Sequence, residues 1–252
     1  MRSIRGGSGL GDSLYLQSVV RHLIGKGESL RVHSDWPAVF GQLGDMVTVE
    51  PFSRKNINIL AHYSSRKALT NSTQWEDVCA SAGISEPVEL RLDWAPETTL
   101  DIRPYVCVQL PRAPMGRSDG FGADLLPDCR LIQRAIDALR DRFAIVQIGA
   151  GEPLFRFKHL DLDLTGKTSV AGMLDVAAGA SGFLGYVSYI VPLAESLDKP
   201  AMLVWSHKGL SRGHPYIRQI TPAKILSKPS CKFVIDNWPL ADIDKVFDGF
   251  LH

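Results

Sequence analysis

The stretch "RGGSGLGDSLYLQSVVRHLIGKG", residues 5–27, decides the fold. A turn rich in glycine follows a short strand and leads into a helix, where apolar residues recur at helical spacing until glycines end it. This order of strand, turn and helix is typical of the first unit of a parallel α/β sheet. An acidic residue, Asp12, stands where the turn meets the helix, and it bears on the chemistry.

Two phosphate-binding motifs come close to this turn and fail at the same residue. The spacing from Gly6 to Ser13 is that of a phosphate loop, but Asp12 stands where the loop needs lysine. Gly7 and Gly9 fit the dinucleotide fingerprint, whose third glycine is again replaced by Asp12. A carboxylate repels phosphate, so the turn favours close approach of something else to the backbone. Asp12 can be the N-cap of a helix that begins near Ser13, a catalytic carboxylate, or both.

The composition is that of an ordinary globular protein. The 252 residues are 45% hydrophobic and 22% charged, and the formal net charge is +1. This charge gives no indication of a nucleic-acid partner or of binding to an acidic membrane surface. We expect no transmembrane segment, no signal peptide and a cytoplasmic location. The four cysteines are far apart, so we expect neither disulfides nor a metal site; they are Cys79, Cys107, Cys129 and Cys231.

Strands and helices alternate along the first hundred residues and then stop at prolines. Short β-rich runs predict strands, and apolar periodicity predicts helices. The expected strands are 3–5, 29–35, 46–52 and 57–63, and the expected helices are 13–24 and 73–84. Segment 85–104 carries three prolines, which suit a linker better than a central strand.

The alternation restarts after this segment. Apolar runs such as "YVCVQL" (105–110) predict strands buried on both faces of a parallel sheet. The other expected elements are strands at 144–151, 182–188 and 201–206, and helices at 130–143, 168–180 and 189–199. We therefore predict an α/β protein of two Rossmann-like, doubly wound parallel sheets facing across a cleft. The predicted domains are 1–98 and 99–252, and ligands are expected at the carboxyl ends of the strands.

Two segments resemble a known family. "GLGDSLYLQSVVRHLIGKGESLRVHSD" (9–35) resembles the N-terminal region of the ADP-heptose:lipopolysaccharide heptosyltransferases, which are glycosyltransferases of family 9 with the GT-B fold. "DLTGKTSVAGMLDVAAGASGFLGYVSYIVPLAESLDKPAMLVWS" (163–206) resembles their C-terminal stretch. The resemblance implies a metal-independent, inverting transfer of a sugar from a nucleotide diphosphate to an acceptor hydroxyl. No other cofactor is implied. Asp12 matches the general base, after an acceptor-side turn that holds Gly9 and Gly11.

The second segment departs from the family pattern where that family holds the donor diphosphate. Ser188 matches the motif serine, but Val187 replaces an aspartate, Tyr189 a glycine and Pro192 a histidine. In the first segment, Ser18 stands where proline is usual. The alternative hypothesis is therefore a non-catalytic binding protein that kept the fold and lost donor binding. A third is an epimerase-like enzyme or a phosphorylase of the same architecture, because fold alone does not fix function.

Five further residues are candidates for donor binding. Arg112 and Arg117 follow a central strand and could face the diphosphate, or they are exposed loop arginines. Glu152 could accept hydrogen bonds from ribose hydroxyls, or it is a solvated loop carboxylate. Ser188 could donate to phosphate at the start of its helix. Thr168 could do the same, or it caps the next helix.

The first half also carries two histidines at strand ends, His33 and His62. Lone histidines are more often structural than catalytic, although their pKa lies near neutrality. The sequence does not identify the acceptor, which could be a lipopolysaccharide-type glycan, another saccharide or a modified nucleic-acid base.

Overall fold

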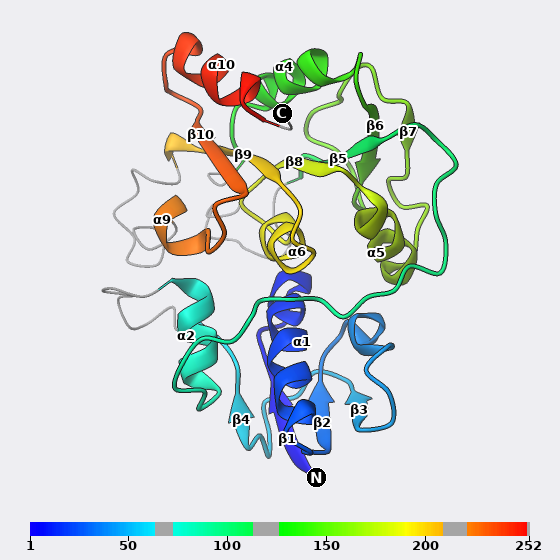
Figure 1. The fold of residues 1–252 in the computed structure, drawn as a ribbon, viewed down its shortest axis with the longest axis vertical. Coiled ribbons are helices and arrows are strands. Elements are labelled where there is room, and N and C mark those ends of the chain that lie inside the picture. The colour runs from blue at the N-terminus through cyan, green and yellow to red at the C-terminus, as the bar shows by residue number, and fades with distance from the viewer. Residues whose placement is uncertain (64–72, 113–125, 209–220, 251–252) are drawn as a thin grey trace.

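Two separate parallel sheets build the protein (Figure 1). A computed structural model describes residues 1–63, 73–112, 126–208 and 221–250. The first sheet has the strand order β3-β2-β1-β4, and the second has the order β10-β9-β8-β5-β6-β7. The described strands pair in parallel throughout. The predicted class, two parallel α/β sheets, is confirmed, whereas the exact domain border and the cleft stay predictions.

The first half is centred on β1 (Arg2–Arg5), which pairs with β2 on one side and β4 on the other. Its long helix α1 (Leu10–Gly25) buries Leu14, Leu16 and Val19 completely, as the apolar periodicity predicts. The helix begins three residues earlier than expected. The other elements are β2 (Leu30–His33), η1 (Pro37–Phe40), β3 (Val47–Glu50), β4 (Ile59–Leu60) and α2 (Gln74–Ser81).

The second half begins with β5 (Tyr105–Gln109), whose five residues are all buried. The strands β6 (Ala144–Ile148), β8 (Gly182–Tyr186) and β9 (Ala201–Trp205) are buried in the same way, because helices cover both faces of the sheet. The remaining elements are α4 (Cys129–Leu139), β7 (Leu162–Asp163), α5 (Val170–Gly179), α6 (Ile190–Ser196), α9 (Pro222–Ile225), β10 (Cys231–Ile235) and α10 (Leu240–Asp248).

The two faces of the second sheet contribute to different apolar clusters. One face packs under α4 and α10 and forms a cluster of its own, which includes Ile136 and Phe247. The opposite face carries α5 and α6, and its cluster runs on without a break into the core of the first half. In Figure 1, α6 lies between the second sheet and the upper end of α1. The halves therefore share one continuous core through α6.

Gly11 sits at the point where α1 meets α6. A Cβ atom on Gly11 would lie 3.3 Å from the Cα of Tyr189 and 3.3 Å from Cγ of Pro192. Such spacing is tighter than most real contacts, so glycine allows the first turns of the two helices to touch. Asp12 is the next residue, so its backbone lies one residue away from this contact.

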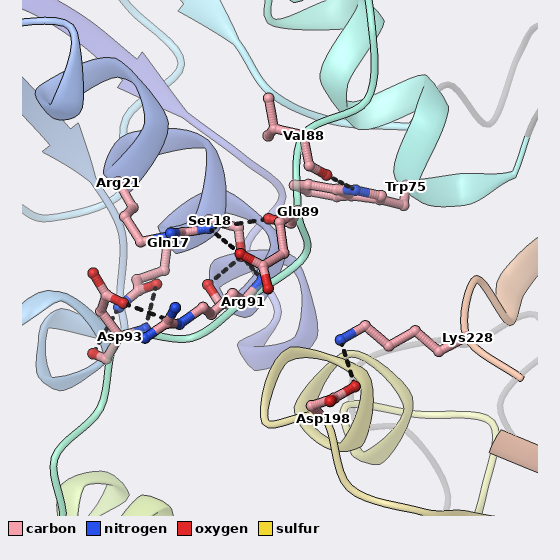
Figure 2. A network of polar contacts seen from close by, with 10 residues as sticks. All are labelled: Gln17, Ser18, Arg21, Trp75, Val88, Glu89, Arg91, Asp93, Asp198 and Lys228. Atoms are coloured by element: carbon pink, nitrogen blue, oxygen red, sulfur yellow. Dashed lines mark hydrogen bonds and ion pairs between the residues drawn. The ribbon is translucent and has the colours of Figure 1, made fainter. Parts of the chain in front are cut away.

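The proline-rich segment between the sheets is bound to α1 by side chains (Figure 2). Ser18 donates from Oγ to the carbonyl of Arg91 at 2.7 Å and accepts from the Arg91 N–H at 3.1 Å. Gln17 makes the same two-way pairing with the backbone of Asp93, at 3.1 and 3.3 Å. Both side chains are fully buried. Ser18 and Gln17 therefore hold the segment against α1 through paired backbone hydrogen bonds.

The same segment is also attached to the second half. The Leu92 N–H donates to the carbonyl of Ser196 at the end of α6. Asp175 of α5 is 5% exposed and accepts from Trp94 Nε1 at 2.8 Å. It also accepts from the backbone N–H groups of Glu97 and Thr98 and from Thr98 Oγ1. The linker is thus held on both sides.

Across these described ranges, we find no helix that combines the length and apolar character needed to cross a bilayer. The four cysteines are buried and unpaired with one another. Burial raises the pKa of Cys129 to about 11 and that of Cys231 to about 12, so both remain protonated thiols at neutral pH.

Candidate active site

Asp12 is the third residue of α1. Gly9 is the N-cap, and Asp12 Oδ2 accepts a hydrogen bond from the Gly9 N–H at 3.0 Å. The carboxylate therefore satisfies a free amide at the helix start, as the sequence predicts, but it does so from inside the first turn. The N-cap assignment of Asp12 was wrong because the helix begins at Leu10 and takes Gly11 into its first turn.

The glycines of the turn hold the carboxylate against the backbone. A Cβ on Gly7 would lie 2.2 Å from Asp12 Oδ2 and 2.8 Å from Nε2 of His62. No side chain fits there, so Gly7 is required by the close approach of these two groups. Trp36 Nε1 donates to the carbonyl of Ser8 at 2.9 Å and fastens the turn from the other side. Gly9 serves as the N-cap of this acceptor-side turn.

His62 is the titratable group that faces Asp12. It follows β4, and its Nε2 lies 3.9 Å from Asp12 Oδ1. Its ring stacks on Tyr63 with centroids 4.5 Å apart, and its backbone N–H donates to Ser81 Oγ. The side chain of Asp12 is 18% exposed and that of His62 is 29% exposed. One oxygen of Asp12 thus binds the helix start, while the other faces a partly open position beside an imidazole.

His33, the second histidine noted in the sequence, has a different setting. It is buried at the end of β2, and its Nδ1 lies 3.3 Å from the carbonyl of Pro51 and 3.8 Å from Glu50. These contacts fit the structural role expected of a lone histidine.

The carboxyl edge of the second sheet carries the described donor-side candidates. Arg112 follows β5, Glu152 follows β6, Thr168 follows β7 and Ser188 follows β8. Ligands of open parallel sheets bind along this edge. Arg117 lies outside the described residues. That these side chains form one phosphate pocket stays a prediction.

Arg112 and the loop of Glu152 touch each other. The Arg112 guanidinium donates from Nη1 to the carbonyl of Ala150 at 2.6 Å, and it packs so close to Gly151 that a Cβ there would lie 2.6 Å from Nη1. The backbone of Arg112 is bonded to the hydroxyl of Tyr186. Glu152 itself is exposed. Arg112 is therefore fixed at the edge, and within the part of the chain that the structure describes its other guanidinium nitrogens make no hydrogen bond.

Thr168 and Ser188 take part in helix starts. The N-cap of α5 is Ser169, whose Oγ accepts from the Gly172 N–H at 3.1 Å. The capping role considered for Thr168 belongs to its neighbour. Ser188 Oγ accepts from the Ile190 N–H at 3.2 Å. The helix that follows, α6, has only seven residues, all of them buried, and its first turn packs on Gly11.

Two site-like residues were missed from the sequence. His207 follows β9 and Asp236 follows β10, so both leave the sheet at its carboxyl edge. Nδ1 of His207 lies 2.5 Å from Asp236 Oδ1. The sequence signal that could have found them is a polar residue within two residues of the end of each strand, in "VWSH" and "FVID". Within the residues that the structure describes, no three metal-binding side chains come together.

These features define the class of fold: two Rossmann-like parallel sheets joined by a short connection, which is the GT-B arrangement of glycosyltransferases. No protein-family model matches the sequence, and no curated protein matches it.

Solved structures with this fold include several heptosyltransferases. The chain is similar to E. coli ADP-heptose lps heptosyltransferase II, with a TM-score of 0.62 and 13% identity over 98% of this chain and 97% of that one. It is similar to the glycosyl transferase family 9 protein of Veillonella parvula, with a TM-score of 0.60 and 10% identity over 100% and 90%. It is also similar to the iron-containing dodecameric glycosyltransferase TibC of enterotoxigenic E. coli, with a TM-score of 0.61 and 16% identity over 92% of this chain. The chain spans 62% of the length of TibC. At these low identities, the similarity of the structures shows a shared fold and nothing further.

Proposed function

We propose that the protein is an inverting, metal-independent glycosyltransferase that moves a sugar from a nucleotide-diphosphate sugar to an acceptor hydroxyl. The observation that carries the proposal is the setting of Asp12. Its carboxylate is anchored through Oδ2 by the Gly9 N–H, and Oδ1 remains beside His62 next to the contact between the halves. The neighbours of the same fold include a heptosyltransferase solved with ADP-D-beta-D-heptose, which supports a nucleotide sugar as the donor.

The reaction needs one base and one group of cations. Asp12 Oδ1 takes the proton of the acceptor hydroxyl as the oxygen attacks the anomeric carbon. The bond from that carbon to the diphosphate breaks on the opposite face, so a single displacement inverts the configuration. The leaving diphosphate carries the electron pair away, and its developing charge needs a positive partner such as the guanidinium of Arg112. A carboxylate base suits this task because the negatively charged phosphates repel it, which keeps the base apart from the leaving group.

A second candidate function, a non-catalytic protein of the same fold, is favoured by one observation. Tyr189 and Pro192, which replace the glycine and histidine of the family's donor motif, pack against Gly11 at the join. The place where the resemblance puts the donor diphosphate is therefore partly occupied by the contact between α1 and α6.

Donor binding separates the two candidates. A thermal-shift screen of ADP-, GDP-, UDP- and CDP-sugars tests the purified protein, since a donor at 100 times its Kd stabilises by about 2.7 kcal/mol. We expect a shift with one class of donor, followed by release of that nucleoside diphosphate when acceptors are added. No shift with any donor at millimolar concentration would support the non-catalytic protein instead. Nucleotide sugars and four reduced, buried thiols make the cytoplasm the proposed compartment.

A further inference from the structure

His207 and Asp236 form a fixed pair at the carboxyl edge of the second sheet. The strands β9 and β10 are parallel neighbours with Trp205 opposite Ile235, and the next N–H, that of Asp236, donates to the Trp205 carbonyl at 2.9 Å. The two residues therefore leave adjacent strands at the same level. Neither takes part in the reaction described for Asp12.

Asp236 holds the imidazole in one orientation. Its side chain is 7% exposed, whereas that of His207 is 42% exposed. Asp236 Oδ1 accepts from the backbone N–H of His207 at 2.9 Å and lies 2.5 Å from His207 Nδ1. Asp236 Oδ2 accepts from the Asp128 N–H at 3.1 Å. A buried carboxylate thus gathers three N–H donors and turns the other edge of the ring toward solvent.

The pairing decides which ring nitrogen carries the proton. A carboxylate accepts and does not donate, so the hydrogen between His207 and Asp236 belongs to Nδ1. In a neutral imidazole the other nitrogen, Nε2, is then an acceptor with an exposed lone pair. Among the described residues, Nε2 has no hydrogen-bond partner. The pair of His207 and Asp236 therefore presents Nε2 as one oriented hydrogen-bond acceptor for a donor group of a ligand.

The position of this pair is that of a ligand-binding edge. Tyr186, the last residue of β8, lies opposite Val204 of β9. Ser188 comes two residues after the end of β8, and His207 comes two residues after the end of β9. Neighbouring strands are about 4.8 Å apart. His207 therefore stands one strand away from Ser188, on the edge where parallel sheets bind their ligands.

The charges around the ring favour a neutral donor group over a phosphate. Asp128 is paired with Arg130 through Oδ2 at 2.6 Å, which leaves the carboxylate of Asp236 directly behind the imidazole. The ion pair of Asp128 with Arg130 adds no net charge, and Asp236 adds one negative charge behind the ring. These charges offer a dianion no net attraction, whereas a hydroxyl needs only the lone pair on Nε2.

We propose that His207 Nε2 accepts a hydrogen bond from a hydroxyl of the nucleotide sugar, with Asp236 as the positioning residue; this rests on the proposed function. The hydroxyl belongs either to the ribose or to the transferred sugar. Both hydroxyls present the same chemistry to the imidazole, and ligands that lack one hydroxyl or the other distinguish the two cases.

The test compares two substitutions that treat the ring nitrogens differently. His207→Asn keeps an amide near the position of Nδ1, where it can bond Asp236, and it removes Nε2. His207→Gln places an amide near the position of Nε2. His159→Asn is the matched control, because His159 is an exposed histidine near the opposite edge with a φ of 62°, which asparagine tolerates.

Affinities are measured by calorimetry for ADP, GDP and UDP, for their 2′-deoxy and 3′-deoxy forms, and for the corresponding nucleotide sugars. We expect His207→Asn to weaken binding about five- to tenfold, the share of one neutral hydrogen bond, while His207→Gln and His159→Asn stay within about threefold of wild type. If the hydroxyl is on the ribose, one deoxy nucleotide binds wild type and His207→Asn equally. If it is on the sugar, only the nucleotide sugars lose affinity.

Three results overturn the proposal in distinguishable ways. Equal affinity of wild type and His207→Asn for every ligand removes His207 from the site and leaves the proposed function standing. A loss that appears equally with inorganic pyrophosphate makes His207 a phosphate donor and excludes the hydroxyl assignment. A wild-type protein that binds no nucleotide and no nucleotide sugar refutes the proposed function together with this inference.

Discussion

Replacing Asp175 measures how firmly the linker is held to the second half. The carboxylate accepts four hydrogen bonds from residues 94–98, at 2.8 to 3.2 Å. A hydrogen bond to a charged acceptor contributes about 1.5–3 kcal/mol. The donors on the exposed residues Glu97 and Thr98 regain water when the carboxylate is lost, so we count about half of the total. Asp175→Ala should therefore lower the free energy of unfolding by about 3–6 kcal/mol.

The pH dependence gives a second, independent signature. Burial alone raises the pKa of Asp175, but the hydrogen bonds from Trp94, Thr98 and Glu97 outweigh it and hold the pKa below its ordinary value. A carboxyl whose folded pKa is depressed stabilises the fold above its unfolded pKa, about 3.9, and loses that contribution as pH falls through the folded pKa. Asp175→Asn does not titrate. The stability difference between wild type and this variant should therefore narrow between pH 6 and pH 3.

Urea denaturation, followed by far-UV circular dichroism, measures both effects, and Asp101→Asn serves as the control. Asp101 is exposed in the same segment, and its replacement should change stability by less than about 0.5 kcal/mol. The reasoning is refuted if Asp175→Ala costs less than about 1 kcal/mol. It is refuted equally if the difference between wild type and Asp175→Asn stays constant down to pH 3.

Two further predictions concern the contacts of α1. Ser18→Ala removes both hydrogen bonds to the Arg91 backbone at a fully buried position, so we expect the free energy of unfolding in urea to fall by about 1–2 kcal/mol. The control Ser29→Ala, at an exposed position, should change it very little, and an equal effect of the two variants would mean that the bonds of Ser18 do not stabilise the fold. Gly11→Ala places a methyl group 3.3 Å from Tyr189 and Pro192 and should lower the melting temperature. Gly25→Ala is the control in the same helix: nothing lies within 4 Å of the added Cβ, so it should stabilise the protein by up to about 1 kcal/mol. Stabilisation by both variants would show that the first turns of α1 and α6 do not touch in solution.

Much of the fold could be predicted because its signals are local. Buried parallel strands such as β5 and β9 are continuous apolar runs, and the prolines of 85–104 mark the break between the sheets. The start of α1 was misplaced because glycines at 9 and 11 look like a turn. Gly11 is helical, and its lack of a side chain serves packing against α6.

The contacts that fix the site were harder to foresee because they join residues far apart in the chain. Gln17 and Ser18 look like ordinary polar helix residues, and only the fold shows that the linker lies on them. The pairing of His207 with Asp236 depends on which strands become neighbours. Asp12 was found because the glycine turn and the carboxylate are adjacent in sequence, whereas its approach to His62 spans 50 residues.

Turnover of the Asp12→Asn variant tests the central claim most directly. Asparagine still offers an oxygen to the Gly9 N–H, so the helix start and the donor affinity should be kept, while the base is lost. With the donor found in the thermal-shift screen, turnover should fall by about 10²-fold or more at unchanged melting temperature. Asp12→Ala, which also loses the bond to Gly9, should in addition cost about 1 kcal/mol of stability, the share of one hydrogen bond. Turnover by Asp12→Asn within about threefold of wild type would contradict the account.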